Sequence, residues 1–347
     1  MSNHNKCPLT IVTGFLGSGK TTLLSRILRD NSFAGTSVII NEYGEVGLDH
    51  RFIRRIEERT TLLSGGCVCC NRRDDLVNEL RMMLNSSEQG EIPLDRVIVE
   101  TTGLADPAPI LFSIFTHPLL VHHFYIDMVL TCLDAVNGEL HLNGNPESVK
   151  QIVAADKVII TKTDLIAEKN IKQLQEKIQQ LNPAADIMTS SFGKMDIASI
   201  FCANQPHGVR VMSQDKEKQM QEIETKPGGK HGANIHSMSI QFAKPLDWVA
   251  FGLWMSMLLH VHGEKIFRVK GIVDVGEAGP IIINGVQHII HPPQHLANWR
   301  DDEEQVSQIV FIMKDINPQE ILASLQAFQN MIGAKPEIQE INMDPFA

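Results

Sequence analysis

The sequence contains no apolar run long enough to cross a bilayer, so a membrane-spanning protein is not expected. Its first six residues, Met1 to Lys6, lack the apolar core of a secretion signal, which predicts a cytoplasmic protein. Positive charge is scarce, because 31 Lys and Arg face 41 Asp and Glu and the formal net charge is −10. This balance argues against a nucleic-acid or anionic-membrane partner bound through charge.

The sequence also lacks an internal repeat and the cysteine pattern of a disulfide scaffold. It has six cysteines in 347 residues, and three of them crowd at positions 67, 69 and 70. In a reducing compartment such crowding more often indicates metal or redox chemistry. Apolar residues are plentiful at 43%, and the length fits two domains, each with a packed core.

The most informative stretch runs from Gly14 to Thr22 and fits the pattern Gly-x-x-x-x-Gly-Lys-Thr. A β-branched apolar run precedes it at 9–13, and the apolar residues at 23, 24, 27 and 28 recur with the spacing of one helical face. A strand, a glycine loop and a helix N-terminus together surround a phosphate with backbone N–H groups. The stretch therefore predicts a nucleotide-binding loop formed by Gly14, Gly17, Ser18, Gly19, Lys20, Thr21 and Thr22.

Four residues have predicted roles in hydrolysis. Lys20 is expected to reach the β and γ phosphates, and the Thr21 hydroxyl to ligate the Mg²⁺ that bridges them. A strand predicted at 96–99 ends at Glu100, whose carboxylate is suited to holding the magnesium shell or orienting water. Gly103, in the next turn, lets a backbone N–H approach the γ-phosphate without a Cβ in the way. No arginine or glutamine is assigned to the attacking water, so we expect slow intrinsic turnover; a plain strand-to-turn junction is the alternative for 100–107.

A polar, glycine-punctuated loop at 41–49 follows a strand predicted at 36–40 and carries Glu42, Glu45 and Asp49. In nucleotide-switch proteins a loop in this place orders around the γ-phosphate and relaxes on hydrolysis. Ordinary solvated acids fit the same three residues equally well.

The tetrapeptide Thr161-Lys162-Thr163-Asp164 follows a strand predicted at 157–160 and resembles the Asn-Lys-x-Asp element of GTP-binding proteins. An aspartate in the place of Asp164 accepts hydrogen bonds from guanine N1–H and N2–H₂, while the Lys162 stem lies over the base. Because adenine would leave Asp164 unpaired, guanine should be selected. Thr161 lacks the asparagine amide, so we expect one orienting contact to be lost. Residues 189–191 are a further candidate contact to the base.

The order of predicted elements indicates an α/β fold. Nearly all-apolar strands alternate with helices through residues 1–204, which predicts a doubly wound, mostly parallel sheet of the P-loop NTPase type. Residues 205–236 have the composition of a flexible linker. A second, smaller α+β domain is predicted at 237–347, with strands at 237–242, 266–275, 280–290 and 306–313 and helices at 246–259 and 318–331.

Cys67, Cys69 and Cys70 precede a helix predicted from about residue 74 to 84, and a helix N-terminus lowers the pKa of a nearby thiol. Three thiolates suit Zn²⁺ better than Mg²⁺ or Ca²⁺. They leave a coordination place for water, Glu45, His117 or a ligand from a client protein, and such an open site is what metal transfer requires. Buried inert cysteines and redox cycling are the alternatives.

Taken in order, these motifs resemble the CobW family of P-loop GTPases, relatives of the GTPases that insert nickel into urease and hydrogenase. The likeness covers nearly the whole chain, including the C-terminal stretches at 268–272 and 285–288. Its motifs are Gly14–Thr22, Asn41–Asp49, Gly65–Cys70, Glu100–Pro107 and Thr161–Asp164. The resemblance implies a GTPase that uses GTP and Mg²⁺ and passes Zn²⁺ to client apo-metalloproteins, as a monomer or weak homo-oligomer. Metal sensing or storage with a structural nucleotide is one alternative, and delivery of Co²⁺ for corrinoid synthesis is another.

Overall fold

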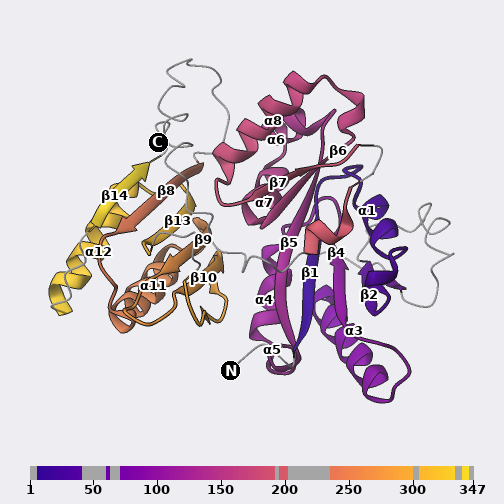
Figure 1. The fold of residues 1–347 in the computed structure, drawn as a ribbon, viewed down its shortest axis with the longest axis horizontal. Helices are drawn as coiled ribbons and strands as arrows, with labels where there is room; N and C mark the ends of the chain where they lie inside the picture. The colour runs from indigo at the N-terminus through magenta and orange to yellow at the C-terminus, as the bar shows by residue number, and fades with distance from the viewer. Residues whose placement is uncertain are drawn as a thin grey trace. The chain divides into compact units, whose positions relative to one another are not determined.

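The computed structural model describes residues 6–40, 60–62, 71–191, 195–201, 235–299, 305–332 and 338–343 (Figure 1). The chain divides into two compact units. One comprises residues 1–176 and 185–204, and the other comprises residues 177–184 and 205–347. The expected linker at 205–236 lies almost entirely outside the described residues. The division at 204 and 237 therefore stays a prediction.

The first unit is built on a seven-stranded sheet with the order β3-β2-β4-β1-β5-β6-β7. Its recorded strand pairings are all parallel, which confirms the predicted sheet type. The first strand, β1, lies in the middle, so the loop that follows it sits between the two halves of the sheet, where doubly wound folds bind ligands. The strands are β1 (Cys7–Thr13), β2 (Thr36–Ile40), β3 (Thr60–Leu62), β4 (Arg96–Glu100), β5 (Phe124–Asp134), β6 (Lys157–Thr161) and β7 (Asp186–Thr189).

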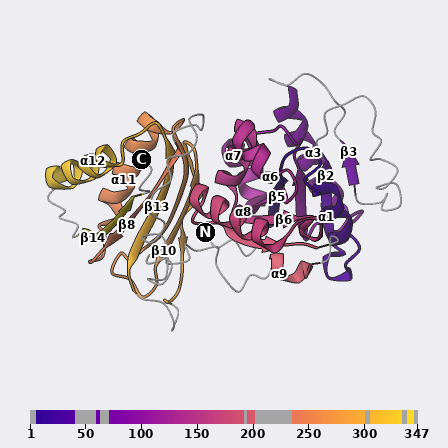
Figure 2. The same cartoon turned by 90° about the horizontal axis from the view of Figure 1, so that it is seen from above.

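Both faces of this sheet are buried, as its almost continuously apolar strands predict. Val12, Ile98 and Leu130 pack with α1 and α9 on one face, while the alternate residues Ile11 and Val129 are equally buried on the other. Figure 2 shows the helices around the sheet. They are α1 (Lys20–Ile27), α3 (Asn71–Glu88), α4 (Ala108–Thr116), α5 (Pro118–His123), α6 (Gly138–Gly144), α7 (Pro146–Ala154), α8 (Glu168–Leu181) and α9 (Ile197–Phe201), with 3-10 turns at Asn31–Phe33 and Thr163–Leu165.

The register of the parallel strands brings the ends of the central strands to one edge. Val12 pairs with Glu100 across β1 and β4, and Asp134 pairs with Thr161 across β5 and β6. The segments that follow these strands therefore meet at the carboxyl edge of the sheet. The phosphate loop, the Glu100 turn and the Thr161–Asp164 turn all begin there.

The second unit is a mainly antiparallel sheet with two helices on one face, which confirms the predicted α+β class. The sheet order is β11-β10-β9-β13-β8-β14, and β12 pairs with β10. Phe251 and Trp254 of α11 and Leu325 of α12 pack against the strands in one core. The elements are β8 (Ile235–Phe242), α11 (Trp248–His262), β9 (Ile266–Val273), β10 (Ile281–Val286), β11 (Ile289–Ile290), β12 (Gln294–His295), β13 (Ser307–Lys314), α12 (Pro318–Ile332) and β14 (Ile338–Met343).

The helix α11 differs from its predicted bounds and carries apolar residues on more than one side. It begins at Trp248 rather than at 246, because the Asp247 side chain accepts a hydrogen bond from the Ala250 N–H at 2.9 Å and caps the helix. The face away from the core bears four large apolar side chains that are 55–70% exposed: Val249, Leu253, Met257 and Val261. No helix in the described part of the chain is long and apolar enough to cross a membrane.

Candidate nucleotide-binding site

Three glycines give the loop after β1 its shape. Gly14, Gly17 and Gly19 have φ of 136°, 72° and 93°, a region that side chains with a Cβ rarely adopt. A Cβ on Gly14 would also lie 2.2 Å from the carbonyl oxygen of Cys132 in β5. The loop can therefore lie tightly against the sheet and lead directly into α1, whose N-cap is Gly19.

The amino group of Lys20 lies inside this loop. Its Nζ donates hydrogen bonds to the carbonyl oxygens of Gly14 at 2.9 Å and Phe15 at 3.1 Å. The buried Ser18 hydroxyl has no hydrogen-bond partner within the described residues. The loop therefore gathers one ammonium group, one hydroxyl and the N-terminus of α1, which is the donor chemistry that a polyphosphate needs.

Thr21, in the first turn of α1, contacts Glu100, the last residue of β4. The Thr21 Oγ1 donates to the Glu100 Oε1 at 3.2 Å, and the Glu100 side chain is buried at the end of β4. A hydroxyl and a carboxylate are hard oxygen donors, and Mg²⁺ prefers such ligands when it also binds phosphate oxygens. The donor set fits magnesium, as the sequence predicts for Thr21.

The turn after Glu100 is tied closely to the phosphate loop. A Cβ on Gly103 would lie 2.6 Å from the backbone nitrogen of Leu16, so only glycine fits between the two segments. The side-chain amide of Gln151, in α7, donates to the carbonyl oxygens of Gly103 at 3.1 Å and Ala105 at 3.0 Å. Gln151 is 1% exposed, and its role was not predicted from the sequence because it approaches the turn from a helix about 50 positions away.

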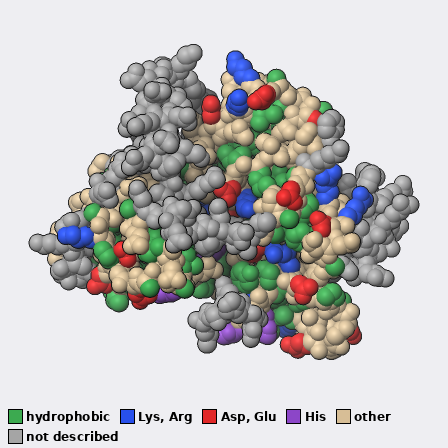
Figure 3. Space-filling view, in the orientation of Figure 1, with side chains coloured by type: hydrophobic (Ala, Val, Ile, Leu, Met, Phe, Trp, Pro, Cys, Tyr) green, Lys and Arg blue, Asp and Glu red, His purple; other side chains and the backbone are tan. Residues whose placement is uncertain are grey.

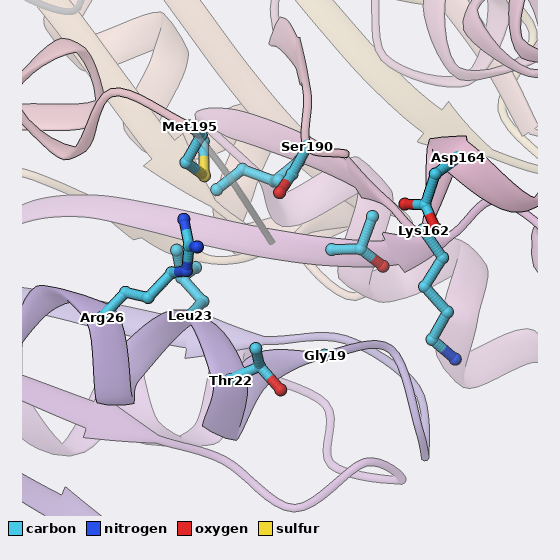
Figure 4. Close-up of a pocket in the computed structure, with 10 residues that line it drawn as sticks. Gly19, Thr22, Leu23, Arg26, Lys162, Asp164, Ser190 and Met195 are labelled. Carbon is cyan, nitrogen blue, oxygen red and sulfur yellow. The ribbon is translucent and has the colours of Figure 1, made fainter. Parts of the chain in front are cut away.

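A pocket of about 230 Å³ adjoins the phosphate loop. In Figure 4, Arg26 of α1 faces Ser190 and Met195, while Lys162 and Asp164 lie at another end of the pocket. The structure thus brings the predicted base-reading residues to the same space as Gly19 and Thr22. Its lining is formed by Gly19, Thr22, Leu23, Arg26, Ile159, Thr161, Lys162, Asp164, Ser190 and Met195. Arg26 and Met195 have no motif that would reveal them in the sequence.

Thr161, which stands where the Asn-Lys-x-Asp element has asparagine, makes a contact that was not predicted from the sequence. Its hydroxyl donates to the Ser18 carbonyl oxygen at 2.8 Å and is 3.3 Å from that of Leu133. The threonine therefore connects the end of β6 to the phosphate loop even though it lacks an amide. On the other side, the Thr163 hydroxyl donates to the Ser190 carbonyl oxygen at 3.0 Å, which joins the turn to the end of β7.

Asp134, at the end of β5, is a site residue that sequence reasoning missed. Its carboxylate accepts hydrogen bonds from Lys162 Nζ at 2.7 Å, the Val136 N–H at 2.8 Å and the Asn137 amide at 3.1 Å. Burial alone would raise the pKa of Asp134. The hydrogen bonds and the charge of Lys162 outweigh burial, however, and hold the pKa below its ordinary value. The carboxylate is therefore ionised at neutral pH.

Residues 8–189 match the family described as CobW/HypB/UreG, nucleotide-binding domain, and residues 235–329 match the cobalamin synthesis protein cobW C-terminal domain. The chain belongs to the CobW family of P-loop GTPases. This confirms the family that the motifs resemble.

Relatives within the CobW family align over most of their length. The zinc chaperone YjiA of Escherichia coli is 31% identical over 328 residues, which cover 92% of this chain and 98% of YjiA. Zinc-regulated GTPase metalloprotein activator 1 of Schizosaccharomyces pombe is 27% identical over 355 residues, covering 92% and 83% of the two chains. A crystal structure of Zn(II)-bound YjiA GTPase from E. coli has a TM-score of 0.67 and 26% identity, and covers 93% of this chain and 99% of that one.

Several residues that the CobW resemblance singles out lie outside the described residues. These are Glu42, Glu45, Asp49, Cys67, Cys69 and Cys70. Within the described residues, no group of three or more His, Cys, Asp or Glu side chains is placed to hold a metal ion. The expectations for the switch acids and for the cysteine ligands therefore stay predictions.

His117 lies away from the phosphate loop. It joins α4 to α5, which leads into Phe124 at the start of β5, and Phe124 pairs with Cys7 at the amino end of β1. His117 is therefore near the edge of the sheet opposite to Glu100. Figure 3 shows histidine side chains gathered beside α5, whose last turn contains His122 and His123. The structure does not bring His117 to the nucleotide site.

Cys132 is a small buried side chain of β5. It is 0% exposed, and burial raises the pKa of its thiol to about 12. The thiol is therefore protonated at neutral pH and does not offer a thiolate to a metal ion.

Proposed function

We propose that the protein is a GTP-hydrolysing metallochaperone that binds zinc through Cys67, Cys69 and Cys70 and delivers it to client apo-metalloproteins. The pocket beside the phosphate loop carries the nucleotide part of this proposal, because Asp164 and Lys162 line it together with residues of α1. The names of the CobW relatives, a zinc chaperone and a zinc-regulated metalloprotein activator, support the zinc part.

Asp164 is the residue that would select guanine. Its carboxylate can accept from the two guanine donors, N1–H and N2–H₂, whereas adenine presents no equivalent pair to it. A site that leaves a polar group unpaired with the wrong ligand discriminates by large factors, up to about 10⁴–10⁵ in favourable cases. The hydrogen bonds of Thr163 to the end of β7 and of Thr161 to the phosphate loop hold the turn that carries Asp164.

Hydrolysis would use the residues at the carboxyl ends of β1 and β4. Lys20 would exchange its hydrogen bonds with the Gly14 and Phe15 carbonyl oxygens for bonds to phosphate oxygens. Thr21 would hold Mg²⁺, which neutralises phosphate charge when bound, with Glu100 beside it. Gly103 keeps a backbone N–H close to the phosphate loop, where the γ-phosphate would lie.

The zinc ligands would lie in a segment that begins at the sheet edge of the phosphate loop. This segment joins the end of β3, at Leu62, to the start of α3, at Asn71. Because β3 is parallel to β2, β4 and β1, its carboxyl end lies at the same sheet edge as the phosphate loop. Three soft thiolates favour Zn²⁺, which is the cargo in this proposal.

Nucleotide and zinc binding are then coupled. Residues 41–49 and the Glu100 turn lie before and after the cysteine segment in the chain, and both are expected to respond to the γ-phosphate. Coupling between two binding sites is reciprocal, and it typically changes affinity by about 5–150-fold. Zinc should therefore alter the affinity for GTP by the same factor by which GTP alters the affinity for zinc.

Equilibrium zinc binding with GTP analogue, GDP or no nucleotide tests the proposal. We expect tight 1:1 binding that changes with nucleotide and is lost in Cys67→Ser. Cys7→Ser is the matched control, because Cys7 lies at the amino end of β1, at the opposite edge of the sheet. Equal zinc affinity in all nucleotide states, or equal losses in the two variants, would refute the proposal.

Transfer of zinc to an apo-metalloenzyme separates the alternatives. A chaperone activates the apo-enzyme faster with GTP than with GDP. A sensor or storage protein retains zinc and gives no activation in either state. Parallel experiments with Co²⁺ show whether the physiological cargo is the metal used for corrinoids, since affinity order alone does not decide between the two ions.

A further inference from the structure

Asp134 is a buried carboxylate that pairs with a residue lining the candidate nucleotide pocket. Its side chain is 3% exposed, yet it is paired with Lys162, whose side chain is 39% exposed and lines the pocket. The pairing follows from the sheet register, because Asp134 lies opposite Thr161, the residue before Lys162. The carboxylate is itself fixed by the backbone N–H of Val136 and the amide of Asn137.

The backbone conformation of Lys162 sets the direction in which the chain leaves β6. Lys162 has φ 57° and ψ 32°, a left-handed conformation that is uncommon for a residue other than glycine. This conformation turns the chain from β6 into the 3-10 turn that carries Asp164. Figure 4 shows the Lys162 side chain extending from that turn at the end of the pocket where Asp164 lies. A long lysine stem is flexible in solution, so a fixed position for it requires a partner for its amino group.

We propose that Asp134 is a positioning residue for nucleotide binding, which holds the Lys162 amino group so that the lysine stem forms a fixed wall for the guanine base. This inference rests on the proposed function in one respect, since it takes a guanine nucleotide as the ligand of the pocket. The carboxylate acts through Lys162 and does not touch the reacting phosphates.

The test compares nucleotide affinity and turnover in Asp134→Asn. The new amide presents an N–H₂ group toward the Lys162 ammonium or loses the hydrogen bond to Val136, so the lysine stem is released. We expect the Kd for GTP and for GDP to rise by the same factor, about five- to tenfold, because the base is common to both. The KM for GTP should rise with them, while kcat at saturating GTP changes less than twofold.

Asp156→Asn is the matched control for loss of a buried carboxylate. Asp156 precedes β6, accepts a hydrogen bond from the Val129 N–H at 2.8 Å, and is buried away from the pocket. This variant should lower the thermal midpoint of unfolding, while its Kd values for GTP and GDP stay equal to those of the wild type. If Asp134→Asn also changes only the thermal midpoint, the carboxylate is structural and the inference is wrong.

A double-mutant cycle with Lys162→Met shows whether Asp134 acts through the lysine. In the Lys162→Met background, Asp134→Asn should change the Kd for GDP less than twofold; an equal effect in both backgrounds contradicts the inference. Failure of zinc transfer with these affinities as expected would overturn the metallochaperone proposal alone. Wild-type protein without affinity for guanine nucleotide would overturn both.

Discussion

At the scale of single residues, the site depends on short polar contacts between strand ends. Thr161 is the clearest example, because its hydroxyl donates to the Ser18 carbonyl oxygen and so connects the end of β6 to the phosphate loop. One hydroxyl group therefore joins the turn that carries Asp164 to the phosphate loop.

Thr161→Val tests this contact, because valine keeps the shape and removes the donor. The Ser18 carbonyl oxygen then loses its partner in a buried place, so we expect about 1–3 kcal/mol of lost stability. The affinity for GDP should fall as the phosphate loop loosens. Urea unfolding and GDP titration measure the two effects. Thr161→Ser retains the hydroxyl and should remain close to wild type in both; a loss as large as that of the valine variant would count against the contact.

The lowered pKa of Asp134 predicts that part of the unfolding free energy depends on pH. Its pKa in the folded protein lies below the ordinary value, so the ionised carboxylate stabilises the fold above about pH 4. This contribution is lost as the pH falls below that value toward the folded pKa, because the carboxylate is then protonated in both states. The difference in unfolding free energy between wild type and Asp134→Asn should therefore narrow below about pH 4, as measured by urea unfolding. A constant difference down to pH 3 would contradict this.

At the scale of elements, α7 controls the turn after β4. Gln151 of α7 donates to two carbonyl oxygens of the turn that contains Gly103, and its own carbonyl oxygen accepts from the Thr131 hydroxyl at 2.8 Å. The helix, strand β5 and the turn are therefore linked by one residue, through its side-chain amide and its backbone carbonyl oxygen. Because the turn adjoins the phosphate loop, its position should matter for the γ-phosphate more than for the base.

Gln151→Leu removes both donors and keeps a buried side chain of similar size. We expect kcat for GTP to fall about tenfold through loss of turn position, while the affinity for GDP stays within about twofold because GDP has no γ-phosphate. Single-turnover hydrolysis and GDP titration provide the measurements. Gln179→Leu is a suitable control, since Gln179 also donates to a backbone carbonyl oxygen, that of Pro183, at 2.7 Å. Equal losses of affinity for GDP and GTP in Gln151→Leu would show that Gln151 does not act on the γ-phosphate, and would contradict the prediction.

The same scale shows what the sequence could predict. The bounds of β2 agree with the predicted strand because apolar β-branched runs between polar turns mark buried strands well. The α3 helix begins at Asn71 and ends at Glu88, beyond its apolar stripe, since polar turns give no periodic signal. Strand β14 was missed because it is recognised only through its pairing with β8, which is distant in sequence.

The candidate site was predictable where a local motif carries the chemistry. The phosphate loop and the Thr161–Asp164 turn are contiguous, and parallel strands bring their ends to one edge, so both could be placed before the structure was known. Asp134 and Gln151 could not, because an aspartate at a strand end and a glutamine within a helix are common in any fold. Only the register between β5 and β6 and the position of α7 give these two residues their partners.

At the scale of the whole molecule, the protein combines a nucleotide-binding unit with a second unit that has its own core. Each unit packs its helices against its own sheet, and the two family descriptions match residues 8–189, mainly in the first unit, and 235–329, in the second. The described residues that line the candidate nucleotide pocket all belong to the first unit.

The apolar residues exposed along α11 have a practical consequence for handling the protein. The exposed face of α11 is a continuous apolar surface formed by Val249, Leu253, Met257 and Val261. At neutral pH the net charge of −10 makes the molecules repel one another and keeps these surfaces apart. Near the isoelectric point, at about pH 5.8, that repulsion vanishes. Concentrated stocks should consequently turn cloudy on mild acidification, well before the fold itself is lost.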